Sequence, residues 1–206
     1  MTSAQRRSPL HDRAPLANEG GTVRLEERRF LGKLILRGRA GPMDEAVAGL
    51  AGAGLPKASP NTAASDAATL LWLSPDEWMV VTEPGAEATL AAGLEEALAG
   101  VHHQIADVTD YYTVLRLAGT ASCEILMKLT TLDMHERAFK PGEVRGTMLM
   151  HCQAVLYMRP ETGDGPSFDI FVRWSMADYL WCLIAECGVE FGLPAQKPVT
   201  GERLVI

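Results

Sequence analysis

The sequence predicts an α+β fold built of two similar halves, each running strand–helix–strand–strand–helix with mostly antiparallel sheets. Apolar runs of strand length alternate with helical patterns, turn-rich segments separate neighbouring runs, and the order of elements occurs twice. The offset between the halves is 79 residues, so that Leu34 matches Thr113. The matching positions are Leu34, Ile35, Leu36, Arg37, Glu45 and Leu50 in the first half and Thr113, Val114, Leu115, Arg116, Glu124 and Leu129 in the second.

Composition divides the chain into three parts. Residues 1–22 are rich in Arg, Ser, Pro, Gly and Asn without periodicity, which predicts an extended or mobile N-terminal arm. Residues 23–192 are expected to form a single α+β domain, with halves at about 23–100 and 101–192. The polar, Pro-containing residues 193–206 read as a C-terminal tail.

The elements of the first half follow from turn residues and periodicity. Met43, Val47, Leu50 and Ala51 fall on one helical face after Gly41-Pro42, which is typical of a helix start. The turn residues at 74–77 between two apolar runs indicate a hairpin. In order, we expect a strand at 30–37, this helix, strands at 69–73 and 78–82, and a helix at 87–99 that carries Leu90, Leu94 and Leu98 on one stripe.

The second half repeats this order around a longer connector. Thr120 is expected to cap a helix, and Ser175 with Asp178 forms a weak capping box for the last one. Inward-facing positions are Ile125, Leu126 and Leu129 on the first helix and Leu180, Leu183, Ile184 and Cys187 on the last. We expect strands at 104–108 and 112–118 around the Thr109-Asp110 turn, the connector at 131–142, and strands at 147–151, 154–158 and 168–173.

Length and charge exclude several classes of protein. The 206 residues are 47% hydrophobic and 22% charged, which is ordinary for a globular chain with a sizeable core. The net charge of −7 argues against nucleic acid as a partner, because phosphate binding needs clustered Lys and Arg. The sequence has no apolar run of membrane-spanning length and no secretory signal, so we expect a cytoplasmic protein. The four cysteines lack CxxC spacing and read as structural thiols.

The usual catalytic and binding patterns give no site, and we assign no catalytic, cofactor-binding or metal-binding residue. His151 and Cys152 are strand neighbours whose side chains point to opposite faces. His102 and His103 lack further ligands at metal-site spacing. No GxGxxG or P-loop follows a predicted strand. Asp107 and Asp110 are expected to cap turn backbone, and the four tryptophans (Trp72, Trp78, Trp174 and Trp181) fit cores and interfaces equally.

Two loops are instead expected to contact partner subunits. The arm has little apolar content beyond a Pro-Leu anchor, and the connector exposes charged residues beside a phenylalanine, a composition that interfaces favour. Phe139 folding back into the core is the open alternative. The expected interface residues are Arg7, Pro9 and Leu10 in the arm and Asp133, His135, Arg137 and Phe139 in the connector.

Three stretches together resemble the gamma subunits of heterotetrameric sarcosine oxidases. They are Leu73-Ser74-Pro75-Asp76-Glu77-Trp78, then Asp107-Val108-Thr109-Asp110 leading into Thr113-Val114-Leu115-Arg116-Leu117 and Gly119, and residues 132–142 with 168–181. The arm motif Arg7-Ser8-Pro9-Leu10 also fits. One departure is Trp174, which stands where that family usually has Arg.

The resemblance implies a structural role without chemistry in this chain. Such a complex oxidises sarcosine to glycine, forms hydrogen peroxide and passes the one-carbon unit to tetrahydrofolate. FAD, FMN, NAD and zinc are expected in the partners, which are the alpha, beta and delta subunits. The fold is expected to be similar to the folate-binding aminomethyltransferase domain. The alternatives are a stand-alone folate-binding or aminomethyltransferase-like protein and a small hydrolase using Cys152 or Cys123.

Overall fold

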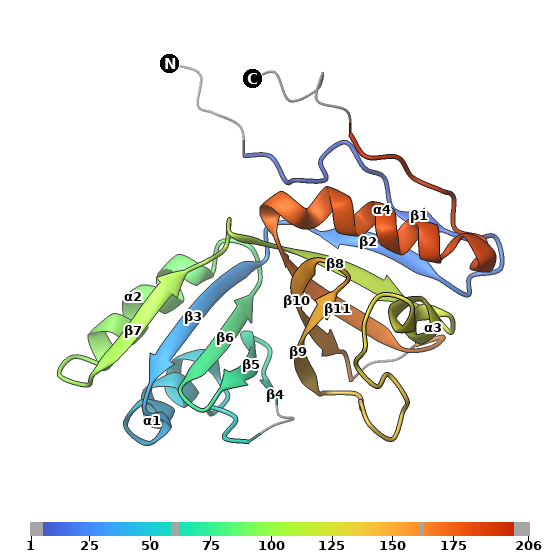
Figure 1. The fold of residues 1–206 in the computed structure, drawn as a ribbon. Helices are drawn as coiled ribbons and strands as arrows, with labels where there is room; N and C mark the ends of the chain where they lie inside the picture. Colours follow the sequence, from blue (N-terminus) through green and yellow to red (C-terminus); the bar gives the residue numbers. More distant parts are fainter. Residues whose placement is uncertain (1–5, 59–61, 161–162, 200–206) are drawn as a thin grey trace, which may run out of the picture.

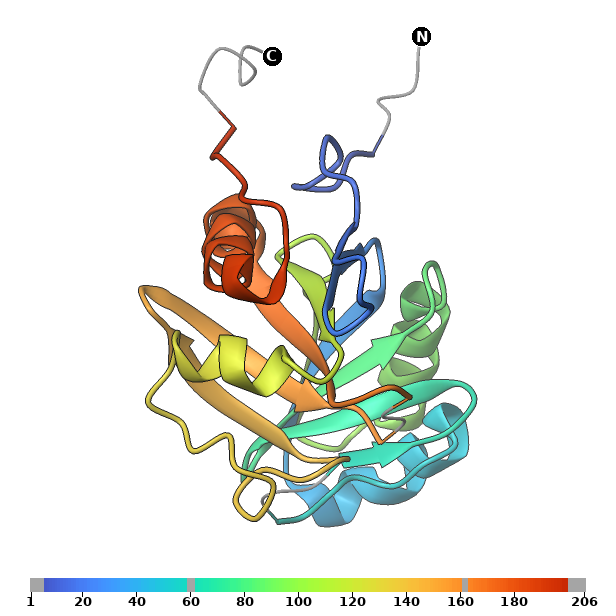
Figure 2. The same cartoon turned by 90° about the vertical axis from the view of Figure 1, so that its right-hand side faces the viewer.

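The computed structural model describes residues 6–58, 62–160 and 163–199, and these form two antiparallel sheets with helices on their outer faces (Figures 1 and 2). The sheets pack against one another, so the layers run helices, sheet, sheet, helices. This arrangement confirms the predicted α+β class. No helix within those residues is long and apolar enough to cross a membrane.

The first sheet has the order β4-β5-β6-β3-β7. Its members are β3 (Gly32–Gly38), β4 (Thr62–Ala64), β5 (Ala68–Ser74), β6 (Glu77–Thr82) and β7 (His103–Asp107), covered by α1 (Ala40–Ala51) and α2 (Glu87–Ala97). The hairpin predicted from the turn at 74–77 is present as β5 and β6, which pair through Leu70 and Val80. On α1, Met43, Val47 and Ala51 are buried as expected, whereas Leu50 is exposed.

The second sheet has the order β1-β2-β8-β11-β10-β9. Its members are β1 (Leu16–Ala17), β2 (Arg24–Arg28), β8 (Tyr112–Ala118), β9 (Val144–Leu149), β10 (Cys152–Met158) and β11 (Ser167–Arg173). The outer layer holds α3 (Ser122–Met127), α4 (Ala177–Cys187) and 3-10 turns at Trp174–Met176 and Val189–Phe191. Neither Thr120 nor Ser175 caps its helix. Asp178 instead accepts hydrogen bonds from Arg13 at 2.9 and 2.6 Å.

The two halves exchange one strand each. β2 precedes β3 along the chain but pairs with β8, and β7 precedes β8 but pairs with β3. The sequence placed residues 24–28 in the first half and put strands 104–108 and 112–118 around a common turn. Both expectations are corrected, because β7 and β8 belong to different sheets. With the exchange included, β4-β5-β6-β3-β7 and β9-β10-β11-β8-β2 are equivalent, and the repeat in topology is real.

Two glycines fix how the repeat aligns. The N–H of Gly38 donates to the carbonyl of Asp76, and the N–H of Gly119 donates to the carbonyl of Pro166, both at 3.0 Å. Both glycines have positive φ, 148° and 114°. Each lies beside the residues that lead into the exchanged strand, His102 and His103 for Gly38 and Thr22 and Val23 for Gly119. A Cβ on Gly119 would stand 2.3 Å from the carbonyl oxygen of Thr22. Gly38 and Gly119 are 81 residues apart, so the offset of 79 was two residues short.

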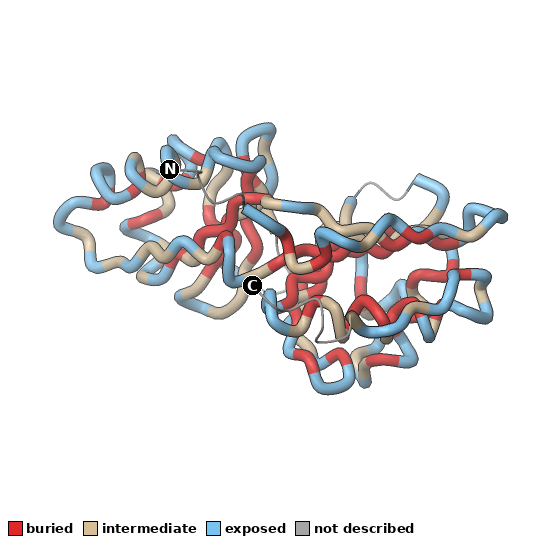
Figure 3. Tube along the Cα trace, turned by 90° about the horizontal axis from the view of Figure 1, so that it is seen from above, coloured by how far each residue is buried: buried red, intermediate tan, exposed pale blue. Residues whose placement is uncertain are grey.

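Apolar side chains form three clusters that match the layers. One lies between the first sheet and α1 with α2, around Leu34, Val47 and Trp78. A second lies between the second sheet and α3 with α4, around Ile125 and Trp181. The third joins the two sheets and includes residues such as Leu71, Met79, Val114 and Phe171. Figure 3 shows buried residues in both halves and in the region where the halves meet, which we call the seam. Apolar contacts therefore join the two halves across the seam.

Candidate functional site

The described part of the N-terminal arm lies along the second half rather than apart from it. Ser8 donates to Glu27 at 2.7 Å, and β1 pairs with β2. Leu10 is only 1% exposed and belongs to the core beside α4. The expectation that the arm adds little to the core is therefore wrong, because Leu10 fills a place that the sheet and α4 leave open. Residues 1–5 lie outside the described residues.

Beside the arm, the exposed rings of Tyr111 and Trp174 and the partly exposed ring of Phe30 form a surface with Arg7 and Pro9 that we call the aromatic face. Arg7, Pro9, Phe30 and Trp174 line one shallow depression. Trp174 joins Tyr111 through a 2.8 Å bond from its backbone N–H to the Tyr111 carbonyl. Both side chains are 47% exposed. Of the four tryptophans, Trp78 and Trp181 are core residues.

Cationic groups frame the aromatic face. The Arg6 guanidinium lies 4.8 Å from the centroid of Phe30 and pairs with Asp110. The Arg173 guanidinium lies 5.6 Å from the centroid of Tyr111. No sequence pattern singled out Tyr111. The available signal was an aromatic pair in the link between two strands, close to the strand–helix junction that carries Trp174.

The connector is split between the core and the surface. Phe139 is 1% exposed, and its ring centroid lies 5.7 Å from that of Phe168. This corrects the expectation of an exposed anchor, because the second sheet and α3 leave an apolar gap that the ring fills. Asp133 and His135 are exposed but accept hydrogen bonds from the backbone N–H groups of His135 and Arg137. Arm and connector lie at opposite ends of the second half, so they form no single site (Figures 1 and 2).

The other candidate residues serve the fold. Burial raises the pKa of the Cys123 and Cys152 thiols, which disfavours a thiolate nucleophile. His103 lies 2.8 Å from the Val101 carbonyl and 3.2 Å from Glu95. Asp107 caps the N–H of Thr109 at 2.8 Å, as predicted. Within the described ranges, no three His, Cys, Asp or Glu side chains are grouped to hold a metal ion.

Comparison with known proteins decides the family. A family model described as "Sarcosine oxidase, gamma subunit family" matches residues 38–190. Sarcosine oxidase subunit gamma of Corynebacterium sp. (strain P-1) is 32% identical over 203 residues, which is 96% of each chain. The chain belongs to the sarcosine oxidase gamma subunit family. The resemblance inferred from residues 73–78, 107–119 and the later stretches is thereby confirmed.

Solved structures agree with this assignment. A chain of the heterotetrameric sarcosine oxidase from Corynebacterium sp. U-96, in complex with pyrrole 2-carboxylate, superposes with a TM-score of 0.81 and 29% identity, covering 93% of this chain and 98% of that one. Aminomethyltransferase T of the glycine cleavage system from Bartonella henselae gives 0.56 at 15% identity, over 78% of this chain and 44% of that one. The second likeness concerns the fold alone and confirms the predicted similarity to the aminomethyltransferase fold.

Proposed function

We propose that this member of the gamma family is a non-catalytic assembly subunit of a sarcosine oxidase complex. The observation that carries the proposal is the match over nearly the whole chain to a subunit of a heterotetrameric enzyme. The complex would demethylate sarcosine to glycine in the cytoplasm, with formation of hydrogen peroxide and one-carbon transfer to tetrahydrofolate. Its alpha, beta and delta subunits would carry FAD, FMN, NAD and zinc.

The chemistry of the chain is consistent with an assembly role. Burial raises the pKa of the Cys123 and Cys152 thiols, Asp107 binds the N–H of Thr109, and His103 lies beside Glu95. The cleft at the seam between the sheets has a volume of about 160 Å³. Pockets that enclose a drug-sized ligand typically have about 300–1,000 Å³, so this cleft is too small to enclose a folate.

Purified alone, the chain is expected to be colourless and without sarcosine oxidase activity. The physical reason is that no Gly-rich dinucleotide loop follows a strand, so nothing cradles a flavin pyrophosphate. A visible absorption spectrum and an oxygen-uptake assay with sarcosine test both points. Flavin absorbance that survives gel filtration, or oxygen uptake by the isolated chain, contradicts the non-catalytic assignment.

We place the main contact with the other subunits on the aromatic face. Exposed Tyr and Trp rings framed by arginines have the composition of binding hot spots, since they bury large apolar areas while their polar atoms keep partners. Half-exposed aromatic side chains gain most from being covered by another surface. The predicted interface residues Arg7 and Pro9 are part of this face, whereas Leu10 and Phe139 act from the core.

Replacing Trp174 by Ala is expected to weaken assembly by about 2 kcal/mol or more, roughly thirtyfold in affinity, with a nearly unchanged melting temperature. Co-expression with tagged partner subunits and quantitative pull-down measures the effect. Val189→Ala is the matched control, because Val189 is similarly exposed but lies in the 3-10 turn after α4, outside the aromatic face. If both variants co-purify like the wild type, the aromatic face is not the interface.

A further inference from the structure

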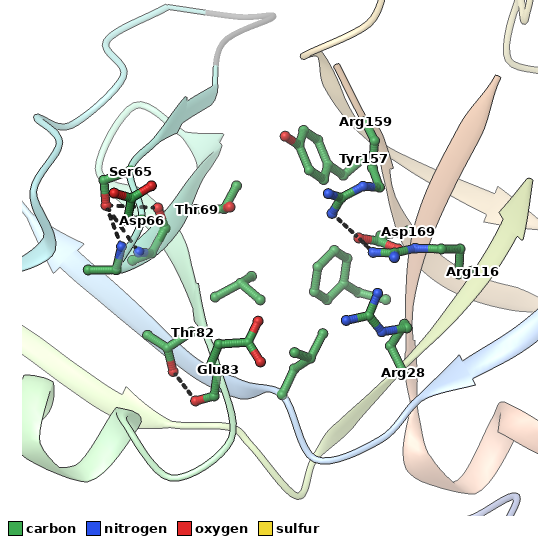
Figure 4. Close-up of a pocket in the computed structure, with 15 residues that line it drawn as sticks. Arg28, Ser65, Asp66, Thr69, Thr82, Glu83, Arg116, Tyr157, Arg159 and Asp169 are labelled. Atoms are coloured by element: carbon green, nitrogen blue, oxygen red, sulfur yellow. Dashed lines mark hydrogen bonds and ion pairs between the residues drawn. The ribbon is translucent and has the colours of Figure 1, made fainter. Parts of the chain in front are cut away.

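The seam cleft, lined by both halves, has two walls of opposite charge (Figure 4). Arg28, Arg116 and Arg159 come from the second sheet, and Glu83, Asp66 and Thr69 come from the first half. Leu31, Val81 and Phe171 add apolar surface. The volume of about 160 Å³ is close to that of a cavity of about 150 Å³ known to hold a six-atom ring, so it suits a ligand of comparable size.

The cationic wall is built around one buried carboxylate. Asp169 accepts two bonds from Arg116, from Nε at 2.7 Å and from Nη2 at 2.8 Å. Arg159 Nη1 lies 3.3 Å from the second Asp169 oxygen. These contacts fix the Arg116 guanidinium in place, because a bidentate Arg–carboxylate pair has a fixed geometry. Three guanidinium groups thus share a wall with one carboxylate.

On this wall, Arg28 differs from Arg116 and Arg159 because its guanidinium is not bound to Asp169. Among residues 6–58, 62–160 and 163–199, its guanidinium makes no hydrogen bond or ion pair. It is half-buried at the end of β2 and points into the cleft (Figure 4). Neighbouring charged residues of β2 behave differently, since Arg24 pairs with Glu26, and Glu27 binds Ser8 and Thr113. The guanidinium of Arg28 is therefore available to an anionic group in the cleft.

Glu83 supplies the opposite charge. Its carboxylate points across the cleft toward Arg28 in Figure 4, and no ion pair joins the two side chains in the structure. The Thr69 side chain faces the same space. A multiply charged anion such as phosphate would suit the arginines but be repelled by Glu83, and a simple cation would suit Glu83 but be repelled by the arginines.

We propose that the seam cleft binds a small zwitterion of the amino-acid class. Its carboxylate would accept hydrogen bonds from Arg28, beside Arg116, and its ammonium group would donate to Glu83. Such a molecule satisfies both walls at once and matches the size of the cleft. The inference depends only on the geometry of this chain, so its failure leaves the assembly role unaffected.

Isothermal titration of the full chain with glycine tests this, using acetate and methylammonium as half-ligands. Saturable glycine binding is expected, with each half-ligand weaker by at least about tenfold, because each makes only one of the two charged contacts. Arg28→Met and Glu83→Gln are each expected to weaken glycine binding by about tenfold or more. Glu83→Gln should leave acetate binding equal or stronger, since it removes a repelling charge.

Matched controls separate recognition from folding. Arg24→Met removes a guanidinium from the same strand, and Glu45→Gln removes an exposed carboxylate from α1, and neither residue lines the cleft. Both are expected to bind glycine like the wild type, and all four variants should keep the wild-type melting temperature. No saturable glycine binding by the folded wild type overturns the proposal. Acetate binding as tight as glycine binding shows a simple anion site and overturns it as well.

Discussion

Replacing Phe139 with Ala is expected to lower the free energy of unfolding by about 3–5 kcal/mol. The ring is buried in the cluster between the second sheet and its helices, packs on Phe168, and lies 5.4 Å from the Arg145 guanidinium. The substitution leaves a cavity that this rigid part of the structure cannot close, so both the transfer energy and the contacts of the ring are lost. Urea denaturation followed by circular dichroism measures the change.

Arg137→Ala is the control for this variant, because Arg137 belongs to the same connector but is exposed. Its free energy of unfolding should stay within about 0.5 kcal/mol of the wild type, as for most surface positions. If Phe139→Ala were no more destabilising than Arg137→Ala, the ring would have to lie on the surface, where the composition of the connector had suggested a partner anchor.

Replacing Lys33 with Met is expected to stabilise the protein at neutral pH by up to about 3 kcal/mol. Lys33 is 1% exposed, and its ammonium group donates to the Leu31 carbonyl. Burial, aided by the charge of Arg6, lowers the pKa of Lys33 from 10.5 to about 8, and Asp110, Glu87 and Asp107 oppose that shift. Each tenfold difference in proton affinity corresponds to about 1.4 kcal/mol, which gives the expected size of the effect.

The sign of the pH dependence follows from the lowered pKa. Between about pH 8 and 10.5 the unfolded chain holds the Lys33 proton more tightly than the folded chain, so the wild type gains stability as the pH rises through this window. Below about pH 8 both states are protonated and the full destabilisation by the buried charge is present. The advantage of Lys33→Met should therefore be largest at pH 7 and shrink by pH 10.

Urea titrations of both proteins at pH 7, 8.5 and 10 resolve this window. Lys140→Met serves as the control, since Lys140 is exposed in the connector and its substitution should not change the pH profile. A Lys33→Met protein less stable than the wild type at pH 7 would show that the hydrogen bond to Leu31 outweighs the cost of burying the charge.

Elements with strong local signals were predictable from the sequence. The hairpin of β5 and β6 follows from turn residues between two apolar runs, and the buried faces of α1 and α4 follow from helical spacing around Val47 and Ile184. β2 was missed because its residues, Arg-Leu-Glu-Glu-Arg, present one buried apolar side chain, Leu25. Its polar side chains bind residues distant in sequence, as where the Thr113 hydroxyl donates to Glu27. No local sequence pattern predicts such contacts.

The candidate sites depended even more on tertiary contacts. Composition drew attention to the arm and the connector as expected contacts with partner subunits, but it could not show that Leu10 and Phe139 turn inward, because exposure is set by gaps that other elements leave. Arg28 shows the converse: the sequence does not distinguish it from the other charged residues of its segment, yet it lines the cleft. It faces Glu83 only because the two halves meet along the seam.

The exchange of β2 and β7 has a consequence for biosynthesis. Arg24 pairs with Ala118, 94 positions later, so β2 leaves the ribosome long before its partner β8 has been made. Pairings this distant in sequence slow folding, and a waiting strand exposes unpaired backbone to other nascent chains. Charged side chains along a strand edge discourage such association. The charged side chains that kept β2 from being recognised as a strand would also protect the nascent chain from association with other chains until β8 is available for pairing.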